Sequence, residues 1–126
     1  MRMRKAVGVV KREALRVELI RALDRDERVL WLCDSRPQYL ERLDDVVGLA
    51  SIRWKNMTQK VRRGSPAVFT LGETGRVTFV STLNAMRGMS ADLVILERDE
   101  ISDEARLFAN LVVSGVGGEV IEVARP

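Results

Sequence analysis

Apolar and polar residues follow one another along this chain in blocks that predict alternating helices and strands. Residues 12–23 repeat apolar side chains at the spacing of an amphipathic helix. Residues 29–33 and 92–96 are short and almost continuously apolar, which is typical of strands covered on both faces. Between them, Ser35 and Pro37 predict the start of a second helix, because serine is a favoured N-cap and proline fits the first turn.

The second helix is expected to run to about Val47 and to end at Gly48. Residues 51–55 are interpreted as a brief strand, and residues 56–64 as a loop or short helix. The β-branched and aromatic segments 67–71 and 76–80, separated by a glycine-containing turn, predict a hairpin.

The last third of the chain continues the alternation. We expect a short helix or turn over residues 84–89, a helix over 102–111 with Ser102 as its N-cap, and a last strand over 119–124. Strands that alternate with helices predict an α/β fold with a mainly parallel sheet, flanked by helices on both faces.

Length and composition narrow the class of protein. At 126 residues with 46% hydrophobic residues, the chain is expected to form one domain over residues 1–126. Its lack of histidine excludes Ser-His-Asp and Cys-His nucleophile systems and histidine-held metals. The single cysteine, Cys33, lies in an apolar run and is expected to be buried and reduced. No export signal or membrane span is evident, so we expect a cytoplasmic protein without a membrane partner.

Charge is distributed unevenly along the chain. Residues 1–63 contain 16 Lys and Arg against 9 Asp and Glu, whereas residues 64–126 contain 5 against 9. This asymmetry favours either contact with a polyanion or self-association through oppositely charged halves.

The most basic segment, residues 53–63, contains five cations, one aromatic residue and no acid. Cations neutralise phosphates and an exposed tryptophan stacks on bases, so this composition predicts a nucleic-acid-binding surface. The alternative is a solvated loop with its tryptophan packed in the core. The candidate binding residues here are Trp54, Lys55, Lys60, Arg62 and Arg63.

Carboxylates cluster after the apolar run 92–96. Glu97, Asp99 and Glu100 follow a predicted buried strand, where open α/β sheets bind ligands, so a magnesium ion is a candidate cofactor and these are its candidate ligands. The alternative is a set of solvated acids that favour the first turn of the next helix.

The window from residue 76 to 104 resembles the Walker B region of nucleic-acid motor ATPases. The turn Ala85-Met86-Arg87-Gly88 and the strand 92–96 match the pattern of viral large terminase subunits and, less closely, of superfamily-two helicases. Residues 29–43 are similar to the helicase strand and turn that contact the phosphate backbone, which implies a nucleic-acid contact at Arg36. The resemblance implies a truncated motor core of viral or mobile-element type, with motor or viral proteins as further partners.

Two departures limit what the resemblance implies about activity. No glycine-rich phosphate loop is present, since residues 6–12 supply one glycine and one lysine before a helix. The Asp-Glu pair of the family is replaced by Glu97-Arg98. We therefore expect a nucleic-acid-associated domain without its own ATP hydrolysis. The alternatives are a self-associating interaction or structural module, and a magnesium-dependent phosphoryl-transfer enzyme or nuclease.

Overall fold

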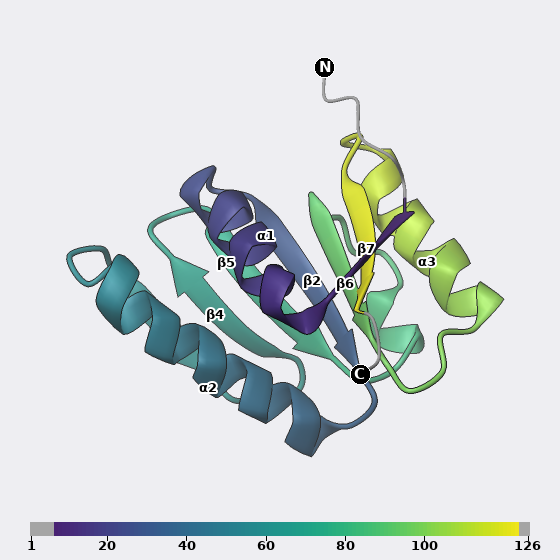
Figure 1. Ribbon diagram of the computed structural model, residues 1–126, viewed down its shortest axis with the longest axis horizontal. Coiled ribbons are helices and arrows are strands. Elements are labelled where there is room, and N and C mark those ends of the chain that lie inside the picture. Colours follow the sequence, from purple (N-terminus) through teal and green to yellow (C-terminus); the bar gives the residue numbers. More distant parts are fainter. Residues whose placement is uncertain (1–6, 124–126) are drawn as a thin grey trace.

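The protein is described here from a computed structural model that covers residues 7–123. Within this range three α-helices, one 3-10 helix and seven strands follow one another along the chain (Figure 1). The helices are α1 (Arg12–Asp24), α2 (Arg36–Arg53), η1 (Asn84–Met86) and α3 (Asp103–Ser114). The strands are β1 (Val7–Val10), β2 (Arg28–Cys33), β3 (Gln59–Arg62), β4 (Ala67–Leu71), β5 (Gly75–Val80), β6 (Leu93–Glu97) and β7 (Glu119–Val123).

All seven strands join one sheet in the order β1-β7-β6-β2-β5-β4-β3. The five strands from β1 to β5 in this order are parallel, whereas β4 and β3 continue the sheet in antiparallel fashion. The predicted α/β class and mainly parallel sheet are confirmed, and so is the hairpin, since β4 and β5 pair with Phe69 opposite Val77.

The two faces of the sheet are covered differently. One core cluster packs α1 and α2 onto the odd-numbered residues of β2, among them Trp31, and includes Phe69 of β4 and Phe79 of β5. The other cluster packs α3 and the η1 segment onto Leu30, Leu32 and neighbouring strand residues. Figure 1 shows α1 and α2 over the same side of the sheet. The second face is covered only over its parallel strands.

Local sequence signals set several helix starts. The Ser35 hydroxyl accepts a hydrogen bond from the backbone N–H of Gln38 at 3.3 Å, and the Ser102 hydroxyl accepts one from Ala105 at 3.1 Å. Both serines are the predicted N-caps, and each satisfies a backbone donor that the helix itself leaves unpaired. No helix within residues 7–123 combines the length and apolarity needed to cross a bilayer.

The structure differs from the sequence-based expectations in several local elements. Helix α2 does not end at Gly48 but continues to Arg53, so residues 51–55 form no strand. Residues 59–62 form strand β3 rather than a loop or helix, because pairing with β4 completes the sheet edge. Strand β1 was not predicted, since it is only four residues long and its stability comes from pairing with β7.

Candidate functional site

The carboxyl ends of the parallel strands lie at one edge of the sheet, where open α/β sheets usually bind ligands. Strand β2 ends at Cys33 and β6 ends at Glu97, and the two residues lie opposite each other in the parallel register. The predicted magnesium ligands follow β6 at this edge. The contacts of Glu97 and Asp99 therefore decide whether the residues present fit a metal site.

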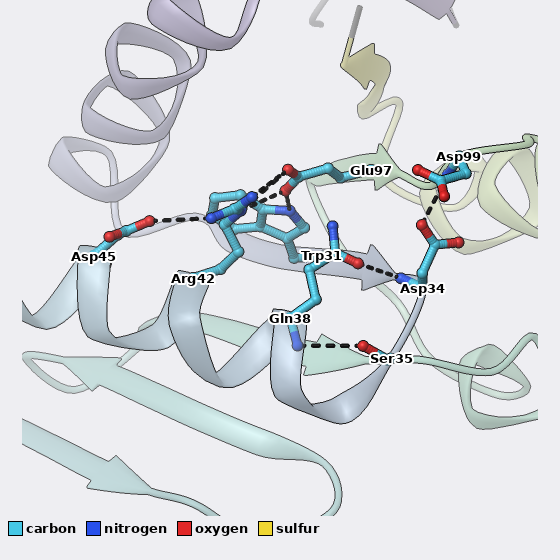
Figure 2. Close-up of polar contacts among 8 residues, drawn as sticks. All are labelled: Trp31, Asp34, Ser35, Gln38, Arg42, Asp45, Glu97 and Asp99. Carbon is cyan, nitrogen blue, oxygen red and sulfur yellow. Dashed lines mark hydrogen bonds and ion pairs between the residues drawn. The ribbon is translucent and has the colours of Figure 1, made fainter. Parts of the chain in front are cut away.

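The carboxylate of Glu97 is bound by side chains from α2 and β2 (Figure 2). Arg42 donates from Nε to Oε1 and from Nη2 to Oε2, each at 2.8 Å. The indole Nε1 of Trp31 donates to Oε1 at 2.9 Å. Both charged residues are only 8% exposed, and the hydrogen bonds to Glu97 raise the pKa of Arg42 above its usual range. This charge-assisted pair holds helix α2 to the end of β6.

The other two candidate metal ligands do not join Glu97. Asp99 is joined to the end of β2 through its backbone, since its N–H donates to Asp34 Oδ2 at 2.9 Å (Figure 2). Glu100 is exposed in the following bend. Over residues 7–123 no group of three acidic or cysteine side chains is arranged to hold a metal ion. Glu97, Asp99 and Glu100 therefore form no such group, and the magnesium site stays a prediction.

The start of helix α1 is the position at which a phosphate loop would lie. Strand β1 ends at Val10 and α1 begins at Arg12, so Lys11 alone connects them. A phosphate loop of the GxxxxGK[ST] type needs several residues whose backbone N–H groups surround the phosphates. A single connecting residue does not provide the several backbone N–H groups of such a loop.

Arginines near the strand ends make internal contacts instead of shaping a ligand site. Arg98 donates to the carbonyl oxygens of Cys33 at 3.2 Å and Ser81 at 2.5 Å, which links the ends of β2 and β5. The guanidinium carbon of Arg87 lies 5.9 Å from the centroid of the Phe108 ring. Asp92 pairs with Arg28 at 3.6 Å, because the two residues lie close together at the opposite edge, where β2 and β6 begin.

The predicted stacking residue Trp54 is buried, so the alternative interpretation of this residue is correct. It is 6% exposed and packs in the core below α1 and α2. Its Nε1 donates to Asp24 Oδ1 at 2.9 Å, which ties the end of α2 to the end of α1. Trp54 is therefore unable to stack on a base in this structure.

The other five candidate nucleic-acid-binding residues lie in three different parts of the structure. Arg63 pairs with Asp44 of α2 at 2.6 Å, and Arg36 donates to the Arg63 carbonyl oxygen at 2.9 Å, so these two lie together beside α2. Lys55 is exposed in the turn after α2. Only Lys60 and Arg62 project from strand β3 itself.

Lys60 and Arg62 lie on the same face of the sheet as α3, over the edge strands that α3 does not reach. In the antiparallel register Lys60 is opposite Thr70, which is opposite Arg76, and Arg62 is opposite Val68. Directly opposed residues project to the same side of a sheet. The residues that alternate with them in β4 and β5, Phe69, Leu71 and Val77, are buried in the core cluster with α2. The side chains of Lys60, Arg62 and Arg76 therefore project from the opposite face of the sheet. We call this surface the open sheet face, comprising Arg28, Lys60, Arg62, Val68, Thr70, Arg76 and Thr78.

The open sheet face includes a shallow hollow of about 460 Å³, bordered by Arg28, Arg62, Arg76 and the segment 88–91. Among residues 7–123, Lys60, Arg62 and Arg76 have no carboxylate partner, whereas Arg28 lies beside Asp92. The sequence did not indicate Arg28 and Arg76 as candidate binding residues, because they lie outside the basic segment 53–63. The alternation of Arg76 and Thr78 with buried Val77 and Phe79 was the signal that could have found this surface.

Comparisons with known proteins give a similarity of fold. No family model and no curated protein matches the sequence. One crystal form of the large terminase from a thermophilic bacteriophage matches 95% of this chain and 33% of its own, with a TM-score of 0.62 and 11% identity. A second form of that terminase, in complex with ADP, matches 79% of this chain and 26% of its own, with a TM-score of 0.56 and 13% identity.

The chain thus spans about a third or less of the length of these terminase chains. At such low identity the similarity concerns the course of the backbone and not the residues of a site. The resemblance seen in residues 76–104 therefore extends to the fold: the chain has an α/β sheet similar to that of a large terminase domain.

Proposed function

We propose that this chain is a nucleic-acid-associated domain of viral or mobile-element type, with the sheet of a motor ATPase but without a working nucleotide site. The terminase-like fold supports the first part of the proposal. The single-residue connection at Lys11 supports the second. The engagement of Glu97 by Arg42 and Trp31 also supports it, because a carboxylate held this way is not offered to magnesium.

The open sheet face is the observation that carries the nucleic-acid part of the proposal. Four cations from three strands project there, with two threonine hydroxyls between them. Lysine, arginine and hydroxyl groups are the usual protein contacts to phosphate oxygens. Side chains on a sheet surface with no helix to enter a groove contact the phosphate backbone rather than the base edges, so we expect little sequence preference.

A salt-dependent anisotropy titration with labelled DNA and RNA tests this proposal. Three or four phosphate contacts predict that affinity for duplex DNA falls about 40- to 150-fold between roughly 50 and 200 mM salt. Absence of binding at the lower salt concentration contradicts the proposal. If the protein does not bind nucleic acid but forms salt-sensitive oligomers in light scattering, the alternative of self-association is favoured instead.

A further inference from the structure

The hollow on the open sheet face has one closed side and one open side. Toward the parallel strands it is bordered by the segment 88–91, which lies on the same face of the sheet as α3. The N–H of Ala91 donates to a carbonyl oxygen of α3 at 3.2 Å, and the N–H of Asp92 donates to that of Arg28 at 2.9 Å. The segment is thus fixed between α3 and the start of β2. On the other side the hollow extends to the edge strand β3.

Three arginines line this hollow, and none of its described lining residues is acidic. Arg62 and Arg76 are exposed, and within residues 7–123 neither has a carboxylate partner. Arg28 lies opposite Arg76 in the parallel register, and it is paired with Asp92 at 3.6 Å. Three guanidinium groups against this one carboxylate leave positive charge in excess. Because like charges on neighbouring strands repel, a bound anion would relieve a repulsion that remains within the chain.

The floor of the hollow combines one hydroxyl group with apolar side chains. Thr78 lies between Val68 of β4 and Leu30 of β2 in one row across the sheet, and all three residues line the hollow. Met89 adds a flexible apolar side chain at the border. A volume of about 460 Å³, with a few polar groups on an apolar surface, is typical of sites for small ligands. The hollow thus offers cations for a phosphate beside an apolar surface for the attached nucleoside.

The course of the strands indicates how a nucleic-acid chain would reach this hollow. Lys60 and Thr70 extend the row of Arg76 toward the open edge at β3. A phosphate backbone that follows this row from β3 reaches the hollow and then meets the segment 88–91, so the end of a strand fits this position. A terminal phosphate monoester carries about 1.5 to 2 negative charges near neutral pH, more than the single charge of an internal diester.

We propose that this hollow binds the terminal phosphate monoester of a nucleic-acid strand, with Arg62 and Arg76 on its oxygens and the end nucleoside over Val68 and Met89. This inference rests on the proposed function and adds to it a preference for phosphorylated ends. A dianion gains more from the excess positive charge than a singly charged diester does, and guanidinium groups bind phosphate oxygens through charge-assisted hydrogen bonds.

The test compares single-stranded DNA oligonucleotides of about 12 nucleotides that differ only at one end. One pair has a phosphate or a hydroxyl group at the 5′ end and fluorescein at the 3′ end, and a second pair has these ends exchanged. We expect anisotropy titrations at roughly 100 mM salt to show that a phosphate at one of the two ends strengthens binding at least about fivefold.

Arg76→Gln and Lys60→Gln are matched variants, since each removes one exposed cation from the open sheet face but only Arg76 lines the hollow. We expect Arg76→Gln to reduce the preference for the phosphorylated end below about twofold. Lys60→Gln should weaken binding of both oligonucleotides alike and keep the preference. Both variants should retain the melting temperature of the unmodified protein, because both side chains are exposed.

The outcomes distinguish this inference from the proposed function. A preference below about fivefold at both ends would overturn the inference, while binding itself would still support the nucleic-acid surface. A preference that both variants reduce equally would also overturn it. Displacement of the phosphorylated oligonucleotide by inorganic phosphate at the concentration needed for an unlabelled copy would show that free phosphate, and not a strand end, is the ligand. Absence of binding to every oligonucleotide would overturn both the inference and the proposed function.

Discussion

Arg42 and Glu97 are 55 positions apart in the sequence and form a buried, bidentate ion pair that joins helix α2 to the end of strand β6. The pair occupies the strand end at which the acidic cluster predicted a magnesium ligand. The carboxylate of Glu97 instead joins two elements of the fold.

Removing one partner of this pair should be costly. We predict that Glu97→Ala lowers the free energy of unfolding by about 3–5 kcal/mol, because it leaves the Arg42 guanidinium buried without its carboxylate. Arg42→Met combined with Glu97→Leu should cost less than the sum of the single changes, since no charge remains buried. Urea denaturation provides the measurement. A loss below about 1 kcal/mol for Glu97→Ala would show that the pair contributes no more than an exposed one.

The thiol of Cys33 should be inert in the folded protein. Burial, with a further contribution from the nearby charge of Glu97, raises the pKa of Cys33 to about 12. The side chain is also fully buried. Reaction with iodoacetamide at about pH 8 is therefore expected to be at least a hundredfold slower than in urea-unfolded protein, because the thiolate is the reactive form. Equal rates in the two states would contradict the described burial.

Gly118 should be intolerant of any side chain. A Cβ there would collide with the backbone carbonyl of Asp92, which is itself held by the N–H of Glu119 at 2.9 Å. We predict that Gly118→Ala destabilises the protein by about 1–3 kcal/mol in thermal or urea unfolding. Gly115→Ala is the matched control, because its Cβ would meet nothing within 4 Å. Equal effects of the two substitutions would contradict this packing.

Asp24 should make stability depend on pH in the acid range. Its hydrogen bonds from Arg53, and then from Trp54, lower its pKa below the usual value despite partial desolvation. A carboxylate with a lowered folded-state pKa stabilises the protein above about pH 4, and this contribution is lost as the pH falls through the folded-state value. Asp24→Asn should therefore cost up to about 1 kcal/mol at pH 7, in keeping with an exposed pair.

The difference between Asp24→Asn and the unmodified protein should shrink as unfolding is repeated at decreasing pH below about 4. Arg21→Gln offers a control, because it removes an exposed pair with Glu18 within one helix. A difference in the free energy of unfolding that stays constant down to about pH 2 would show that the charge of Asp24 does not contribute to stability.

The sequence predicted those elements whose signals are local. The N-caps Ser35 and Ser102 and the hairpin from β4 to β5 depend on neighbouring residues, and the structure has them as expected. The prediction that α2 ends at Gly48 is wrong, because the packing of Ala50 and Trp54 in the core continues the helix beyond this glycine, although glycine is common at helix ends. Strand β3 depends on pairing with β4, which no local pattern reveals.

The candidate site was harder to predict for the same reason. The pairing of Glu97 with Arg42 depends on how α2 lies on the sheet, so the acidic cluster alone suggested a metal. Trp54 was placed among exposed cations by composition, yet its hydrogen bond to Asp24 belongs to the core. Lys60 and Arg62 were identified, but Arg28 and Arg76 reach the same surface only through the register of four strands.

The most direct test of the proposed nucleic-acid surface compares two double variants that remove equal charge from different places. Arg62→Gln with Arg76→Gln changes the open sheet face, whereas Arg36→Gln with Arg63→Gln changes the cluster beside α2. In anisotropy titrations with duplex DNA, we predict that the first pair weakens binding at least about tenfold at roughly 50 mM salt and reduces the salt slope by about 2. The second pair should stay within about threefold. Equal losses, or a larger loss in the second pair, would contradict binding at the open sheet face.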